Sequence, residues 1–98
     1  MIPPHIKAGI DGYVDKGNCV GHFFRAVLSN DLFEAVFRAD GESLSCLHDI
    51  CLYVFNFTPA PCWGSKKKVV AWLKLHKENP VQAEKIAYGD RNNRRDYG

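Results

Sequence analysis

The sequence has little that would identify a known chemistry. It contains no glycine-rich phosphate loop, no nucleophile and base at a recognisable spacing, and no closely paired cysteines or histidines of the kind that bind zinc. The longest apolar run is residues 50–55, far below the roughly 20 apolar residues that a membrane-spanning helix needs. We therefore expect no enzyme, no catalytic residues, no metal site, no cofactor and no membrane partner.

The net charge is also small. Thirteen basic and eleven acidic residues give +2, which is too little to indicate nucleic acid as a partner, because phosphate binding needs clustered lysine and arginine. The N-terminal residues 1–5 lack the basic stretch and apolar run of a secretory signal, so we expect a cytoplasmic protein. There, Cys19, Cys46, Cys51 and Cys62 are expected to be free, mostly buried thiols; in a secreted chain they could form two disulfides.

With 98 residues, the chain is predicted to be all-α, a compact bundle of about five short helices. Residues 1–80 form the predicted domain, and residues 81–98 a C-terminal extension. The first helix begins at Pro3-Pro4 and ends at Gly17, which adopts the left-handed C-cap conformation readily. Its buried stripe has helical spacing: Ile6, Ile10, Tyr13 and Val14.

Two further short helices are predicted on either side of Ser29-Asn30-Asp31, whose side chains are favoured helix caps. The helix over residues 20–28 is expected to bury Phe23, Phe24, Val27 and Leu28. The helix that follows the caps is expected to bury Leu32, Ala35, Val36 and Ala39.

The fourth helix is predicted over residues 43–56, and its apolar C-terminal half should place it at the centre of the fold. A strand over residues 51–57 is the structural alternative. Two prolines make residues 58–65 a loop, and Ser65 should cap a fifth helix over 66–76. Its inner face is Val69, Trp72, Leu73 and His76, and its lysines face water. A short helix from Val81 and a mobile polar tail from Gly89 complete the prediction.

Metal and thiol chemistry are weakly indicated. His48 and Cys51 could share a helix face, but Cys46 and Cys51 are five residues apart and point in different directions. A reactive cysteine would need an imidazole beside it in an accessible cleft. We favour the structural interpretation, in which these are buried thiols and surface imidazoles.

The loop around Trp63 is the best candidate for a ligand site. Trp63 is followed by Gly64 and Ser65 at a predicted helix N-terminus, where free N–H groups and lysine charges favour an anion. A tryptophan can also stack on a nucleotide base. The candidate ligand-binding residues are Trp63, Ser65, Lys66, Lys67, Arg25 and Asn30. In the alternative interpretation Trp63 fills the core, Asn30 and Asp31 are only caps, and Arg25 and Arg38 pair with acids such as Asp31, Glu34 and Asp49.

Three segments carry a resemblance: Gly21–Leu32 (GHFFRAVLSNDL), Ala39-Asp40, and Cys62–Ser65 (CWGS). They resemble a group of small bacteriophage and prophage proteins with the pattern G-x-F-L-x-A-V-L-x-N-D-L and a Trp-Gly-Ser loop. The resemblance covers residues 3–75, with Phe24 in the usual leucine position, and implies no particular activity.

From the resemblance we expect a non-enzymatic phage protein in the host bacterial cytosol. It would counter a host defence by sequestering a small anionic ligand of the nucleotide type. The alternative is an inhibitor or adaptor that binds a host protein, which would show an exposed aromatic patch. Six phenylalanines are many for one small core, so a homodimer is also possible.

Overall fold

The structure is a computed structural model that describes residues 2–92 and the side chains of residues 2–88. Within that range the chain forms seven α-helices, one 3₁₀ turn (η1) and no strand. They are α1 (Pro4–Lys16), α2 (His22–Leu28), α3 (Leu32–Arg38), α4 (Gly41–Ser45), α5 (Leu47–Phe57), η1 (Ala60–Cys62), α6 (Lys66–Glu78) and α7 (Pro80–Asn92). The all-α prediction is confirmed, with seven helices in this range rather than about five. None of these helices is long and apolar enough to span a membrane.

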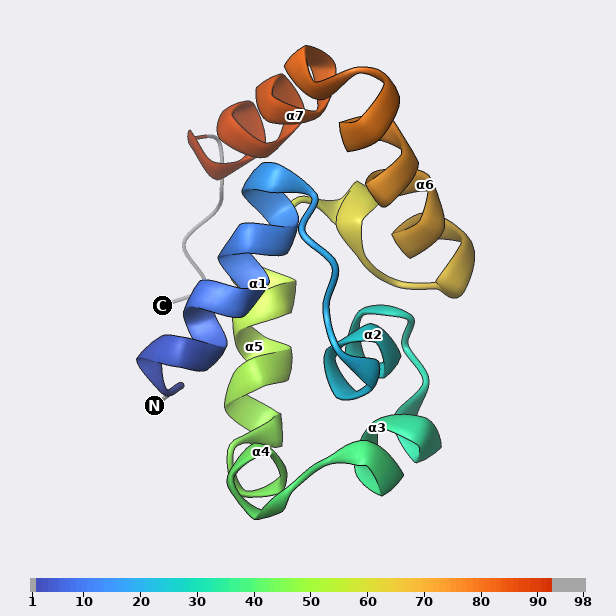
Figure 1. Cartoon of the computed structure of the whole chain (residues 1–98). Helices are drawn as coiled ribbons and strands as arrows, with labels where there is room; N and C mark the ends of the chain where they lie inside the picture. The colour runs from blue at the N-terminus through green and yellow to red at the C-terminus, as the bar shows by residue number, and fades with distance from the viewer. Residues whose placement is uncertain (1, 93–98) are drawn as a thin grey trace.

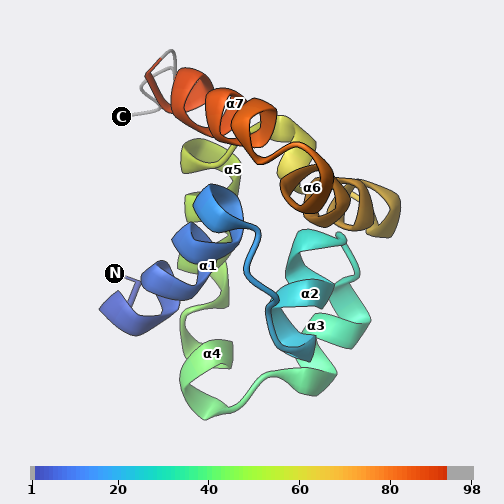
Figure 2. The ribbon, with the colours of Figure 1, turned by 45° about the horizontal axis from the view of Figure 1, so that its top comes forward.

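The helices are arranged so that the last helix packs against the first. Figures 1 and 2 show α5 beside α1, and α7 lying against the C-terminal end of α1 and against α6. Helices α2 and α3 pack against each other at the edge of the molecule, with α2 on the inside. The radius of gyration, 12.8 Å, is that of a compact domain of this length.

Helix α1 is built as the sequence predicts. Its apolar stripe is buried completely, with Ile10, Tyr13 and Val14 at 0% exposure. Gly17 ends the helix in the left-handed conformation, and its N–H donates to the carbonyl oxygen of Tyr13. An added Cβ at Gly17 would lie 2.4 Å from the Cβ of His76, so this position needs glycine for space as well as for conformation.

Side chains of α6 hold the C-terminal end of α1. The indole Nε1 of Trp72 donates to the carbonyl oxygen of Tyr13 at 3.2 Å, and Nε2 of His76 lies 2.9 Å from the carbonyl oxygen of Val14. The Tyr13 hydroxyl in turn donates to the carbonyl oxygen of Cys62 at 2.7 Å. The final carbonyls of a helix lack partners within it. His76 supplies one for Val14, and Trp72 gives the Tyr13 carbonyl a second bond beside the one from Gly17.

The turn between α2 and α3 is a double cap, as predicted. Asn30 has a positive φ of 61°, and the N–H of Asp31 donates to the carbonyl oxygen of Ala26, which closes α2 in a Schellman arrangement. The Asp31 side chain then accepts the N–H of Glu34 and begins α3. Two consecutive residues therefore end one helix and start the next.

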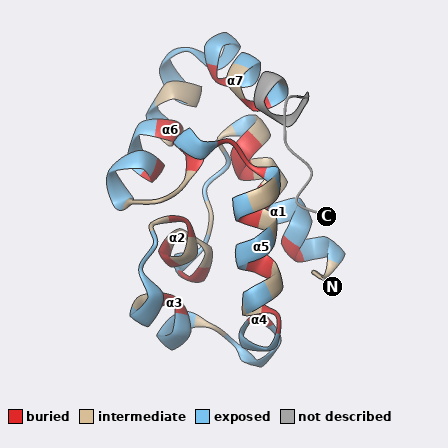
Figure 3. Ribbon diagram, turned by 180° about the vertical axis from the view of Figure 1, so that it is seen from behind, coloured by how far each residue is buried: buried red, intermediate tan, exposed pale blue. Residues whose placement is uncertain are grey.

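Helix α3 buries much less than predicted. Phe23 and Leu28 of α2 are buried, and Phe24 and Val27 half-buried, but in α3 only Ala35 is buried. Leu32 and Val36 are exposed, which corrects the prediction for them, and Ala39 is half-buried. Figure 3 shows α3 mostly exposed beside a largely buried α2. The apolar residues of α3 do recur at helical spacing, but no other described element covers the outer side of this helix.

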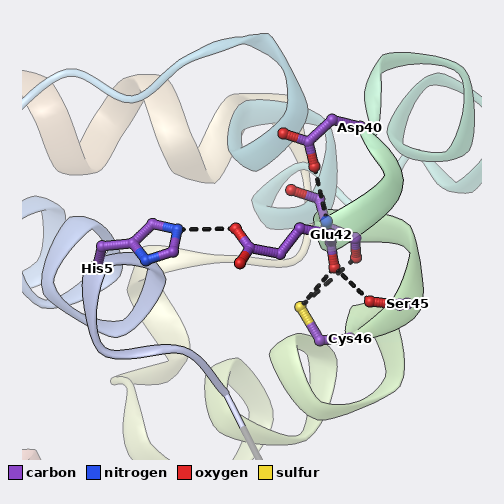
Figure 4. A network of polar contacts seen from close by, with 6 residues as sticks. His5, Asp40, Glu42, Ser45 and Cys46 are labelled. Atoms are coloured by element: carbon purple, nitrogen blue, oxygen red, sulfur yellow. Dashed lines mark hydrogen bonds and ion pairs between the residues drawn. The ribbon is translucent and has the colours of Figure 1, made fainter.

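The predicted helix over residues 43–56 is two helices, which is a correction. Asp40 accepts the N–H of Ser43, so α4 begins at Gly41. Figure 4 shows what ends it: the side chains of Ser45 and Cys46 both donate to the carbonyl oxygen of Glu42, at 2.8 and 3.1 Å. The Cys46 N–H also donates to this carbonyl, at 3.3 Å, so three donors share it. Cys46 then leaves the helical conformation before α5 starts. His5 of α1, 2.9 Å from the Glu42 carboxylate, holds α4 in place.

Helix α5 is at the centre only along one face. Ile50 and Val54 are buried, but Leu52, Phe55 and Phe57 are each about half exposed, so the prediction of a fully central helix is wrong. The β-rich composition of residues 51–57 does not produce a strand, because these residues continue the helix to Phe57.

The C-terminal half follows the prediction closely. Ser65 caps α6 by accepting the N–H of Lys68 at 3.1 Å. Val69 and Trp72 are buried, Leu73 and His76 half-buried, and the lysines at 66, 67, 68 and 74 exposed. Helix α7 continues through residues 89–92, which were predicted to begin a mobile tail; the remainder of that tail lies outside the described residues.

Candidate functional site

A cavity in the described part of the molecule lies between α2, α3 and the start of α6. Its volume is about 550 Å³, within the range of small-ligand sites. It is lined by His22, Arg25, Ala26, Ser29, Asp31, Glu34 and Lys66. The lining is therefore polar and charged of both signs.

One wall of the cavity is a face of α2. His22, Arg25 and Ser29 lie at positions i, i+3 and i+7, which places them on the same side of a helix. Arg25 is half-buried and makes no ion pair with any described acidic residue. The charge of Arg25 also acts on Tyr13 in the core. Burial and Cys62 raise the pKa of Tyr13, and the positive charge of Arg25 partly lowers it.

The second wall is the start of α6, which a backbone contact holds beside α2. The N–H of Gly64, which has a φ of 117°, donates to the carbonyl oxygen of Leu28 at 2.7 Å. This bond fixes the loop before α6 to the end of α2 and brings Lys66 to the cavity. The positive end of the α6 dipole adds to the charge of Lys66.

The third wall is acidic, but both of its acids are already engaged. Asp31 accepts the N–H of Glu34, and Glu34 pairs with Arg38 at 2.6 Å. The cationic groups on the opposite walls have no such partners among the described residues. The cavity can therefore attract an anionic group toward α2 and α6, while the acidic wall can accept hydrogen bonds from hydroxyl or amino groups.

Of the predicted ligand residues, the structure brings two together. Arg25 and Lys66 line this cavity. Ser65 is the cap of α6, and the Lys67 side chain is exposed outside the lining. Asn30 lines a different, smaller cavity of about 80 Å³ between α3 and α5.

Trp63 lies away from the cavity. It is half-buried, packs against the core and meets Phe55 edge-on at 5.7 Å. Its indole Nε1 is buried without a hydrogen-bond partner among the described residues. No phenylalanine, tyrosine or tryptophan lines the large cavity, so the predicted stacking of a base on Trp63 is not what this geometry offers.

The cysteines follow no catalytic or metal-binding arrangement within the described residues. Cys46 and Cys62 are buried and Cys19 and Cys51 exposed, all four as free thiols, so only half of them are buried as expected. Although Cys51 is exposed as a residue, partial desolvation of its thiol raises the pKa, the opposite of what a nucleophilic thiolate needs. No group of three or more metal-ligating side chains is found in this part of the chain.

Sequence reasoning missed His22, Ser29, Asp31 and Glu34 as lining residues. The i, i+3, i+7 spacing of His22, Arg25 and Ser29 would have identified the face of α2. The predicted pairing of Arg38 with Glu34 is confirmed, and of the two arginines whose side chains are described it leaves Arg25 without an ion pair. The approach of α6 depends on the contact between Gly64 and Leu28, which no local pattern encodes.

Comparison with protein-family models, curated proteins and solved structures gives no match for this chain. The function is therefore argued from the cavity and the surface of the molecule.

Proposed function

We propose that this protein acts by binding rather than by catalysis, and that it binds a small anion in the cavity between α2, α3 and α6. The observation that supports this most directly is the convergence of Arg25 and Lys66, from different helices, on one cavity of about 550 Å³. Neither side chain has an ion-pair partner among the described residues. A cation left without a partner at a cavity wall favours an anionic ligand.

The mixed lining narrows the ligand class. A phosphate or carboxylate group would lie against Arg25, Lys66 and the Ser29 hydroxyl. Hydroxyl or amino groups of the same ligand would donate to Asp31 and Glu34. A phosphorylated sugar has both kinds of group, and it forms part of every nucleotide. The ligand is therefore nucleotide-like in its sugar and phosphate, with no requirement that a base stack on Trp63.

A role against host defence rests on the resemblance to phage proteins alone. Under that proposal the protein would lower the free concentration of a host signal by sequestering it. The cavity supports the binding of a small anion. It carries no information about a phage origin or a bacterial host.

The test is a thermal-shift and calorimetric titration with inorganic phosphate, ribose 5-phosphate, and linear and cyclic nucleotides. A ligand at 100 times its dissociation constant adds about 2.7 kcal/mol to stability, which moves the midpoint of a small domain by roughly 10–20 °C. Arg25→Gln should weaken binding at least tenfold. Lys74→Gln, which removes an exposed lysine near Glu78 on the same helix as Lys66, is the matched control. If no anion binds, or Arg25→Gln binds as well as the wild type, the proposal is wrong.

Protein binding is a second candidate, and it is favoured by a different surface. Helix α3 has the exposed aromatic patch that this alternative predicts, centred on Phe33 and Phe37.

A further inference from the structure

The outer surface of α3 is the most exposed apolar face among the described helices. Of its seven residues, four are large, apolar and exposed: Leu32 (66%), Phe33 (75%), Val36 (37%) and Phe37 (78%). Phe33 and Phe37 stack on each other with ring centroids 6.5 Å apart. We define these four residues as the α3 face. Contiguous apolar surface of this kind marks an interaction site.

We propose that a second copy of this chain covers the α3 face, by antiparallel pairing of α3 with α3 around a two-fold axis. The choice of a second copy rests on the charges beside the face. The two charged residues within α3 are Glu34 and Arg38. They lie at i and i+4, one turn apart on one flank, and form an ion pair at 2.6 Å.

A two-fold axis perpendicular to α3 reverses the partner helix, so the N-terminal half of one copy faces the C-terminal half of the other. Phe33 then meets the partner's Phe37. On the flank, Glu34 meets the partner's Arg38, and Arg38 meets the partner's Glu34. The four charges alternate in sign, so each internal ion pair is extended rather than broken. Self-complementarity of this kind is what a two-fold interface requires.

Other occupants fit the surroundings of the face less well. A helix that lies on an anionic membrane has its apolar side bordered by several lysines or arginines; beside the α3 face there is one arginine, and it is already paired. A strongly charged protein partner would meet one acid and one base, whose charges cancel. A second copy presents the same balance of charge.

The opposite flank of the face offers a shape that an aromatic side chain could enter. Leu32 and Ala35 form one side of the 80 Å³ cavity, and Val27, Leu47 and Cys51 form much of the rest. This mainly apolar hollow shares Leu32 with the α3 face, so each copy presents both protruding rings and a hollow.

The area indicates a weak dimer. Taking about 200 Å² for a large aromatic side chain, the face exposes roughly 500 Å² per copy. The total of about 1,000 Å² is at the lower limit for a specific interface. We expect association in the micromolar range, with mass rising from 11.1 kDa toward twice that value as concentration increases.

The first arm of the test is sedimentation or light scattering over a wide concentration range. The wild type should dimerise, and Phe33→Ser with Phe37→Ser should raise the dissociation constant at least tenfold with no loss of helicity. Tyr88→Ser on α7, where the ring is 71% exposed, is the matched control and should leave association unchanged. The proposal would be overturned if the wild type is monomeric at every concentration. It would also be overturned if the double variant dimerises with an unchanged dissociation constant. A monomer that captures a different protein through Phe33 would overturn it too.

The second arm tests the register. Arg38→Glu gives two acids on the flank and Glu34→Arg gives two bases, so each variant should repel itself. Mixing the two variants should restore association, because every facing pair is then opposite in charge. If the mixture associates no better than the separate variants, the antiparallel arrangement is wrong.

Discussion

Helices α1 and α3 start from similar patterns and reach different environments. In both, apolar residues recur at helical spacing. Around α1, residues more than 45 positions away close over the stripe: Cys62, Trp72 and His76 all bond to its last turn. Around α3, α2 covers one side, and the phenylalanines on the other side face solvent. The comparison shows that an apolar stripe predicts a buried face, but the rest of the chain decides whether that face is buried internally or is left for a partner.

The sharpest way to test this difference is to truncate one large aromatic in each region. Trp72→Ala removes a buried side chain that also bonds to Tyr13, and should lower the free energy of unfolding by about 3–5 kcal/mol. Phe37→Ala should change it by less than about 0.5 kcal/mol at concentrations where the chain is monomeric, because the ring is exposed. Urea unfolding followed by far-ultraviolet circular dichroism measures both. Equal losses would show that α3 is part of the core.

A second test uses one substitution at two glycines of the α1 region. Gly17→Ala places a methyl group in a left-handed residue against His76, and should cost about 2 kcal/mol or more. Gly9→Ala is in the helix, with no atom within 4 Å of the new Cβ, and should add roughly 0.5–1 kcal/mol. Thermal unfolding of the two variants should show a lower melting temperature for Gly17→Ala and a higher one for Gly9→Ala. A neutral Gly17→Ala would contradict the tight closure of α6 over the end of α1.

The turn that places α3 should respond to substitution less strongly. Asn30 has a positive φ, which glycine accepts freely and alanine does not. Asn30→Ala should cost about 1 kcal/mol, and Asn30→Gly should be neutral or slightly stabilising. Denaturant midpoints of the two variants provide the measurement. If alanine were tolerated as well as glycine, the double cap would be incorrectly described.

The smallest effect concerns pH at the start of α4. Hydrogen bonding from Ser43 holds the pKa of Asp40 below its ordinary value of 3.8. The carboxylate therefore stabilises the fold fully above that value, and this contribution is lost as the pH falls through the lowered pKa. Asp40→Asn keeps a capping oxygen but has no charge to titrate. Its melting temperature should decrease less than that of the wild type between pH 5 and pH 3; an identical decrease would exclude Asp40 as a contributor.

Local features of the fold were predictable from the sequence because their causes are local. Gly17, Asp31 and Ser65 end or begin helices through their own conformation and side chains, and each was predicted to do so. The stripe of α1 was predicted from spacing alone. The break at Cys46 was missed because it occurs where two side chains and a backbone N–H share one carbonyl, that of Glu42.

The candidate site was only half predictable. Arg25 and Lys66 were identified by charge and position, but their meeting at one cavity depends on the Gly64 to Leu28 contact between distant segments. The exposure of Phe33 and Phe37 was not predictable either, since a helix pattern shows which side is apolar and not what lies against it.

Hydrogen exchange of the wild type at two protein concentrations, one well below and one well above the dimer dissociation constant, tests the difference between α1 and α3 most directly. The amides of α1 should exchange slowly at both concentrations. Those of α3 should exchange quickly in the dilute sample and become protected in the concentrated one. If α3 is as protected as α1 in the dilute sample, or shows no change with concentration, the α3 face is not a surface that a second copy covers.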